Sequence, residues 1–188
     1  SLAFRAFFAL PETITRSDGM PTNALYGLAA MTIKVVEEER PSRLIVAWDP
    51  TGPTFRDEIY PEYKAGRRAT PEGFKAQSPH FRPLMEAFGA LNVEKQGFEA
   101  DDVIGTLAKR ASALGLRVTI LTGDRDALQL VDENVSVLAT GRGVTDTTRY
   151  DPARVRERYG VEPGLMPDLR GMIGDSSDNL PGVPGIGE

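Results

Sequence analysis

The stretch FEADDVIGTLAKRASALGLRVTILTGDRDALQL, residues 98–130, carries the pattern that best indicates the fold class of this chain. Apolar side chains recur at helical spacing over residues 100–114, and Gly115 follows as a typical helix terminator. Residues 117–122 (RVTILT) then form a short apolar run that predicts a buried strand. A helix that leads into a buried strand is the repeating unit of α/β proteins, in which the strands are mostly parallel.

The same alternation extends in both directions from this stretch. We expect helices over residues 23–39, 81–88 and 152–159, the last with Asp151 before it and Gly160 after it. We expect strands over residues 43–48 (RLIVAW, buried), 93–95 and 135–138, and a turn at residues 141–143. The sequence therefore predicts an α/β fold with a mostly parallel central sheet and helices on both faces.

The composition narrows the classes of function. The chain has 188 residues, of which 40% are hydrophobic, so it can bury a core. No apolar run approaches the roughly 20 residues of a membrane span, and we recognise no secretory signal, so we expect no membrane partner. There is no cysteine and one histidine, His80, which excludes a thiolate or multi-histidine zinc centre. Any metal must be bound by oxygen, which favours magnesium or manganese, and His80 is expected to be structural or exposed.

Eight acidic side chains stand out by their positions. Asp49 and Asp124 each follow a predicted strand, so both fall on the rim formed by the carboxyl ends of parallel strands. The other six lie at the start of the helix over residues 100–114, just after Asp124, and in the glycine-rich tail: Glu99, Asp101, Asp102, Asp126, Asp175 and Asp178.

Each of these acids also has a purely structural explanation. An acid can start a turn, sit in a loop, cap a short helix, or occupy the first turn of a helix, where the dipole favours it. Together they point further, because carboxylates about 4 Å apart repel by about 4 kcal/mol per pair at an effective dielectric near 20. Cations relieve that repulsion, and two magnesium-type ions held by carboxylates are the usual arrangement for phosphodiester hydrolysis.

The basic residues are distributed in a way that permits DNA binding. The net charge is −5, but without the eight acids 19 acidic residues face 22 basic ones. Residues 55–82 are polar and basic, and they carry Tyr60, Tyr63 and Phe74, which could stack on unpaired bases at ~1–3 kcal/mol each. We interpret this segment as a functional loop or a loosely held helical segment with phosphate contacts; a solvated basic loop is the alternative.

Six blocks of the sequence resemble one family. They match, in order over nearly the whole chain, the 5′-nuclease domain of bacterial DNA polymerase I and the stand-alone bacterial flap endonucleases and exonucleases. The blocks are LAFRAFFAL (residues 2–10), WDPTGPTFR (48–56), EYKAGRRATP (62–71), FEADDVIGTLAKRA (98–111), TILTGDRDALQLV (119–131) and GDSSDNLPGVPGIGE (174–188).

The resemblance implies a PIN-like 5′-nuclease fold and a role for each matching residue. Ligands of a first Mg²⁺ or Mn²⁺ ion would be Asp49, Glu99, Asp101 and Asp102. Ligands of a second, more distant ion would be Asp124, Asp126, Asp175 and Asp178. Catalytic cations would be Arg5, near the scissile phosphate, with Lys64 and Arg67 of a helical arch or clamp at residues 55–82. DNA-binding residues would be Arg56, Tyr63, Lys64, Arg67, Arg68, Gly182, Gly185 and Gly187.

The resemblance also predicts the organisation of the chain. Residues 1–173 would form the catalytic domain, and residues 174–188 the second-ion loop and the start of a helix–hairpin–helix that binds K⁺. In the family a strand with a further metal-binding aspartate precedes the segment that begins here at Ser1, and the helix–hairpin–helix continues beyond Glu188. We therefore expect a fragment that is one ligand short at the first ion.

The leading hypothesis is a structure-specific, metal-dependent 5′ nuclease of replication and repair. Its partners would be DNA with a 5′ flap, nick or 5′ end, and RNA primer ends. We expect a monomer in the bacterial cytoplasm, associated with the nucleoid. Two alternatives stay open: a magnesium-dependent phosphohydrolase of small molecules, and a non-catalytic DNA-binding fragment.

Overall fold

The computed structural model describes residues 1–141, 143 and 145–187, so the predicted turn at residues 141–143 lies partly outside the described residues. The α-helices are α1 (Leu2–Ala9), α2 (Asn23–Glu39), α3 (Phe55–Ile59), α4 (Glu72–Gln77), α5 (Phe81–Ala87), α6 (Ala100–Ala113), α7 (Pro152–Tyr159) and α8 (Met166–Ile173). Short 3₁₀ helices are η1 (Ser78–His80), η2 (Asp126–Leu130) and η3 (Pro163–Leu165). The strands are β1 (Ile45–Ala47), β2 (Leu91–Val93), β3 (Val118–Thr122), β4 (Val135–Thr140) and β5 (Thr147–Tyr150).

Most elements lie where the apolar pattern predicts them. The predicted helices correspond to α2, α5, α6 and α7, and Gly115 and Gly160 adopt the positive φ that ends a helix. Asp151 caps α7, since its side chain accepts a hydrogen bond from the backbone N–H of Arg154. The strand predicted at residues 93–95 lies earlier, at β2, and α1, α8 and β5 were not predicted.

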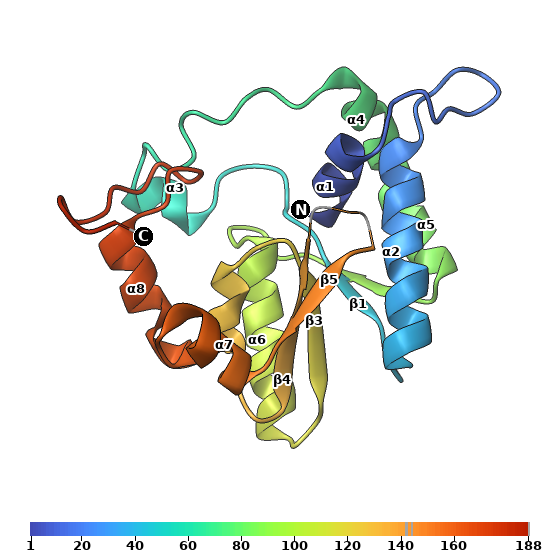
Figure 1. Ribbon diagram of the computed structural model, residues 1–188. Helices are drawn as coiled ribbons and strands as arrows, with labels where there is room; N and C mark the ends of the chain where they lie inside the picture. The colour runs from blue at the N-terminus through green and yellow to red at the C-terminus, as the bar shows by residue number, and fades with distance from the viewer. Residues whose placement is uncertain (142, 144, 188) are drawn as a thin grey trace.

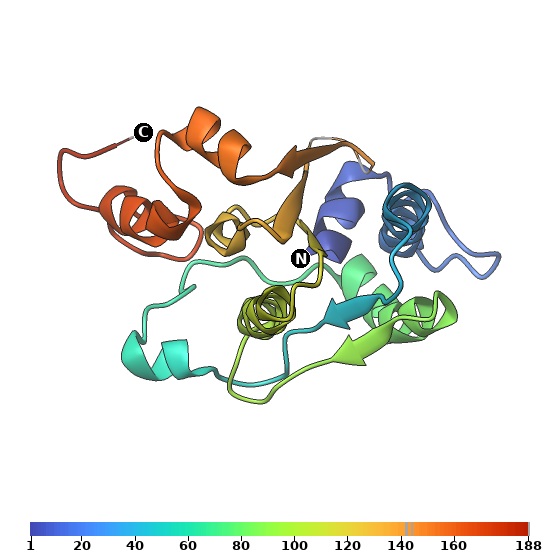
Figure 2. The ribbon, with the colours of Figure 1, turned by 90° about the horizontal axis from the view of Figure 1, so that it is seen from below.

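The α/β class is confirmed, but in the part of the chain that the structure describes the strands form two sheets (Figures 1 and 2). One is the parallel pair β1–β2; the other has the order β3–β4–β5, with β3 and β4 parallel and β5 antiparallel to β4. The prediction that residues 43–48 form a buried strand is wrong: Arg43 and Ile45 are exposed, Ile45 at 44%, and the other four residues are only partly buried. Because β1 pairs with β2 and not with the larger sheet, it is less covered than a central strand.

Each sheet packs on its own hydrophobic cluster. The first cluster joins α1, α2 and α5 through Phe7, Leu28 and Phe81, and Val46 of β1 packs against it. The second lies around β3 and β4 and includes Leu128 and Val137, both fully buried. Helix α6 contacts both β1 and β3, so its N-terminus lies at the boundary between the two halves. That boundary is where the predicted acidic residues must meet.

Polar contacts join elements within the first half and also between the two halves. A buried amide, Gln77, accepts from the N–H groups of Ala24 and Leu25 and donates to Asn23, which ties α4 to the start of α2. Across the boundary, Lys34 of α2 donates to the carbonyl of Thr145 (2.5 Å). Within the described residues, no helix is both long and apolar enough to cross a membrane.

Candidate metal and nucleic-acid site

The eight predicted acids gather along the boundary between the two sheets. Asp49 follows β1 and Asp124 follows β3, as expected for residues at the carboxyl ends of parallel strands. Asp101, at the start of α6, lies close enough to both Asp49 and Asp124 for their charges to change its pKa. Its pKa is raised to about 6, first by loss of hydration among the surrounding atoms and then by repulsion from Asp124, Asp49 and Glu99. The two strand ends and the helix start therefore contribute to one electrostatic site.

The first group, Asp49, Glu99, Asp101 and Asp102, is organised around the N-terminus of α6. Glu99 and Asp102 form a reciprocal capping box, in which the Asp102 carboxylate accepts from the N–H of Glu99 at 2.9 Å. Asp49 Oδ1 accepts from the N–H of Ala100 at 2.8 Å, which fastens the end of β1 to the same helix turn. These bonds set the direction of the carboxylates and satisfy free N–H groups of the helix.

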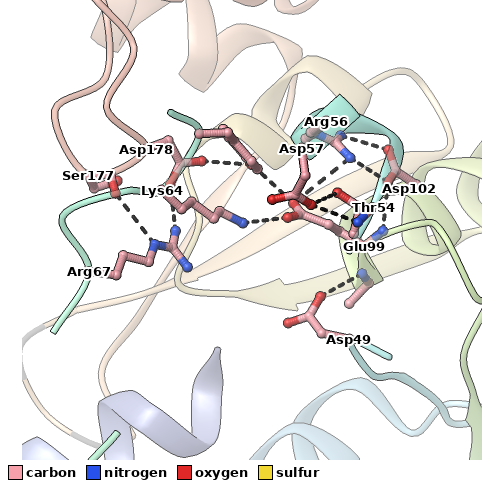
Figure 3. Close-up of polar contacts among 12 residues, drawn as sticks. Asp49, Thr54, Arg56, Asp57, Lys64, Arg67, Glu99, Asp102, Ser177 and Asp178 are labelled. Carbon is pink, nitrogen blue, oxygen red and sulfur yellow. Dashed lines mark hydrogen bonds and ion pairs between the residues drawn. The ribbon is translucent and has the colours of Figure 1, made fainter. Parts of the chain in front are cut away.

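Arg56 of α3 completes this arrangement. Its guanidinium donates to both oxygens of Asp102, at 2.7 and 2.8 Å, as Figure 3 shows. These hydrogen bonds lower the pKa of Asp102, so the carboxylate stays ionised. Arg56, predicted to bind DNA, is thus engaged with a carboxylate of the first group.

The second group, Asp124, Asp126, Asp175 and Asp178, is assembled from two segments. Asp124 Oδ1 accepts from the N–H of Asp126 at 2.9 Å, which fixes the turn that leads into η2. Asp175, after α8, accepts from both the N–H and the hydroxyl of Ser177. Arg170 of α8 joins the segments, donating to Asp126 at 2.9 Å and to Asp175 at 3.1 Å.

The basic segment that follows α3 lies across both groups. Figure 1 shows the chain between α3 and α4 crossing the top of the molecule. Lys64 Nζ lies 2.6 Å from Glu99 Oε1, and Arg67 Nη2 lies 2.5 Å from Asp178 Oδ1 (Figure 3). The backbone N–H of Lys64 also donates to the carbonyl of Asp178 at 3.0 Å. The segment therefore supplies positive charge to one acid of each group.

Tyr63 links the two groups directly. Its hydroxyl lies 3.2 Å from Glu99 Oε2 and 3.1 Å from Asp178 Oδ2. Burial and the charges of Glu99 and Asp178 raise the pKa of Tyr63, so it keeps its proton. A hydroxyl has one proton, so Tyr63 donates to one carboxylate at a time.

The other predicted residues have more varied surroundings. Arg5 donates to the carbonyls of Thr140 and Gly141, beside Gly123 and hence close to Asp124. Arg68, Gly185, Gly187 and His80 are exposed.

One prediction about a residue's role needs correction. Phe74, a candidate for stacking on bases, packs instead against Phe4 and Phe81, with ring centroids 4.6 and 5.3 Å apart. Gly182 lies against the backbone of Gly174 and Ile173 so closely that a Cβ would clash, and its contact with DNA stays a prediction.

Arg170 was not predicted from the sequence. It lies five residues before Asp175, a spacing that does not place two side chains on one helix face, so no local pattern pointed to it.

The donor set suits a hard divalent cation, because every candidate ligand is a carboxylate oxygen. The repulsion felt by Asp101 shows negative charge that the neighbouring side chains leave uncompensated. Within residues 1–141, 143 and 145–187, however, no three acidic or histidine side chains converge in a geometry ready to hold an ion. Four cationic side chains, Arg56, Lys64, Arg67 and Arg170, pair with acids of the two groups.

Comparison with known proteins gives a consistent result. Residues 1–160 match the family described as 5′-3′ exonuclease, N-terminal resolvase-like domain. The whole chain is 48% identical to part of DNA polymerase I of Mycobacterium bovis, 45% to that of Bacillus subtilis and 50% to that of Chloroflexus aurantiacus. The chain spans about a fifth of the length of these relatives, 21%, 21% and 20% respectively.

Solved structures of similar fold include proteins crystallised with metal ions or DNA. A T5 protein co-crystallised with metal ions has a TM-score of 0.71 and 26% identity, over 99% of this chain and 67% of that one. A T5 flap endonuclease complex with DNA and metal ions has a TM-score of 0.68 and 25% identity, over 86% of this chain and 62% of that one. The catalytic core of Rad2 with DNA, at 18% identity and a TM-score of 0.56 over 99% of this chain and 55% of that one, shares the fold.

Proposed function

Because the chain belongs to the family of 5′-3′ exonuclease N-terminal domains, we propose that it is a structure-specific 5′ nuclease that hydrolyses DNA phosphodiesters. One observation carries this proposal: two groups of carboxylates meet at one boundary, and a basic segment pairs with both. Carboxylates attract divalent cations, and a basic segment beside them attracts the phosphates of a nucleic acid. A phosphohydrolase of small molecules would need no such segment.

The metal ligands are the eight acids of the two groups. Asp49, Glu99, Asp101 and Asp102 would hold one Mg²⁺ or Mn²⁺ ion, and Asp124, Asp126, Asp175 and Asp178 another. When bound, such ions lower the pKa of an attacking water and stabilise charge at phosphorus. The T5 relatives crystallised with metal ions support a metal requirement. The C-terminal turn with Gly185 and Gly187 is the proposed place for K⁺.

The cations of the chain would bind and orient the substrate strand. Lys64 and Arg67 now neutralise Glu99 and Asp178, so divalent ions on those carboxylates would free both side chains for phosphate oxygens. Arg68 is exposed beside them, and Arg5 lies near Asp124. These four side chains would hold the scissile phosphate and the 5′ strand against the carboxylates.

The proposed substrates are DNA with a 5′ flap, a nick or a 5′ end, and RNA primer ends. The DNA complexes of similar fold support DNA as the partner. We place the protein, as a monomer, in the bacterial cytoplasm with the nucleoid, in keeping with its bacterial relatives.

A flap substrate labelled at its 5′ end tests this function. With Mg²⁺ or Mn²⁺, the protein should release short labelled products, and EDTA should stop cleavage. Undiminished cleavage in EDTA would reject the metal mechanism. Turnover of a small phosphomonoester with none on DNA would identify a phosphohydrolase. Binding of flap DNA without metal-dependent cleavage would identify a non-catalytic binding module.

A further inference from the structure

Arg170 lies between two acids of the second group that come from different parts of the chain. Its Nε donates to Asp126 Oδ1 at 2.9 Å and its Nη2 donates to Asp175 Oδ2 at 3.1 Å. Asp126 begins η2, whereas Asp175 follows α8. The Arg170 side chain is 30% exposed, so the guanidinium is partly withdrawn from water. One planar group therefore spans the two segments that supply the second group.

The contact is one part of a continuous series of hydrogen bonds. Asp124 accepts from the N–H of Asp126, Asp126 accepts from Arg170, and Arg170 donates to Asp175. Asp175 is fixed on its other oxygen by Ser177, whose N–H and hydroxyl both lie at 2.8 Å. Because each member restrains the next, moving Arg170 would release both the strand-end segment and the loop after α8.

We propose that Arg170 is a positioning residue that sets the separation of Asp126 and Asp175 and thereby the affinity of the second ion. The inference rests on the function proposed above, and it concerns a residue that does not itself touch the ion. Arg170 has two opposing effects on a cation. Its charge repels the ion, whereas its two-pronged geometry holds two mutually repelling carboxylates at a fixed distance.

Arg170 takes one oxygen of each acid, Oδ1 of Asp126 and Oδ2 of Asp175, and the other oxygen of Asp175 is held by Ser177. Because one guanidinium fixes both carboxylates at once, we expect its effect on their separation to outweigh the repulsion between its charge and the ion. A lysine would keep the charge but present a single ammonium in place of the planar fork. Arg170→Lys therefore separates the two effects, and Arg170→Met removes both.

The test measures Mn²⁺ binding to the full chain without DNA, by electron paramagnetic resonance of the free ion. The binding step that weakens in Asp175→Asn identifies the part of the titration that belongs to the second ion. We expect the Kd of the second ion to rise about tenfold in Arg170→Lys and in Arg170→Met, with the first ion changed less than about twofold. Arg154→Lys and Arg154→Met are matched controls, since Arg154 of α7 pairs with Glu157 on the surface and is 51% exposed. They should bind as the wild type does.

Several results would overturn the proposal. Unchanged or tighter binding of the second ion in either variant would show that Arg170 does not hold the two carboxylates in place for the ion. An equal loss of affinity for both ions, or a wild type that binds fewer than two ions, would also refute the proposal. Thermal melting verifies folding, and if Arg170→Met does not fold, Arg170→Lys decides alone. Because no DNA is present, a failure of the nuclease function itself appears separately, in the flap assay.

Discussion

The two carboxylate groups differ in how the chain builds them. The first is largely a property of one helix terminus: Glu99, Asp101 and Asp102 occupy the start of α6, and Asp49 accepts from Ala100 of the same turn. The second needs η2 and the loop after α8 to meet, and a side chain, Arg170, joins them. The backbone of a helix fixes the relative positions of carboxylates at its start, whereas the positions of carboxylates on loops depend on side-chain contacts.

This difference predicts unequal sensitivity. Changes around the first group should lower stability as well as ion binding and cleavage, because its acids also cap α6 and pair with Arg56. Changes around the second group should act mainly on ion binding and cleavage. Asp124 is where the groups meet, since it repels Asp101 of the first and accepts a hydrogen bond from the N–H of Asp126 of the second.

The largest effect is expected for Asp124→Asn. Removing its charge weakens the site that both groups share, so we expect the cleavage rate of a 5′-flap substrate to fall by at least about a thousandfold, or about 4 kcal/mol. Binding of the same DNA in Ca²⁺ or EDTA should change little, because phosphate contacts come from the basic side chains. Single-turnover cleavage and fluorescence anisotropy measure the two quantities.

Asp168→Asn is the matched control for this change, since Asp168 is an exposed acid on α8. It should cleave at the wild-type rate. Wild-type turnover by Asp124→Asn would remove that residue from the site and with it the link between the groups.

An intermediate effect is expected for Arg56→Met, which tests the first group. The substitution leaves Asp102 without its bidentate partner in a position where its side chain is 24% exposed. We expect the free energy of unfolding, measured with urea, to fall by about 2 kcal/mol. Arg154→Met removes an exposed pair from α7 and should cost less than about 0.5 kcal/mol. Equal losses in the two variants would contradict a structural role for the first group.

The smallest effect concerns the pH dependence of stability in EDTA. The pKa of Asp101 is about 6 in the folded chain and near 3.9 when unfolded, so the folded state binds the proton more tightly. The stabilisation of the folded state by protonated Asp101 is complete below about pH 4 and is lost as the pH rises through about 6. Relative to Asp101→Asn, the wild type should therefore lose stability between pH 4 and pH 7.5, by about 1 kcal/mol after allowance for solvent screening of this exposed residue.

Urea unfolding of both proteins at the two pH values measures this difference. Adding Mg²⁺ at pH 7.5 should reduce it, because a bound cation relieves the same repulsion. A difference of the opposite sign would mean that Asp101 is not crowded by other carboxylates.

The local structure of this protein follows from its sequence. Helical spacing of apolar residues predicts α2, α5, α6 and α7, and the glycines after α6 and α7 mark their ends. The acids of the first group could be brought together from spacing alone, because Glu99 and Asp102 lie within one helix turn. The caps and helix spacings depend on contacts between residues close in sequence, which the order of residues specifies directly. The strand ends also predict that Asp49 and Asp124 lie near each other, and both act on Asp101 although β1 and β3 belong to different sheets.

Other features depend on contacts that form only in the folded chain. The division into two sheets, the packing of Phe74 in the core and the partners of Arg56 and Arg170 all involve residues far apart in the chain. An arginine has the same sequence signature whether it meets a phosphate or a carboxylate, and only the folded chain shows which acid lies within reach. That is why the sequence could identify the acids of the second group but not the side chain that holds them together.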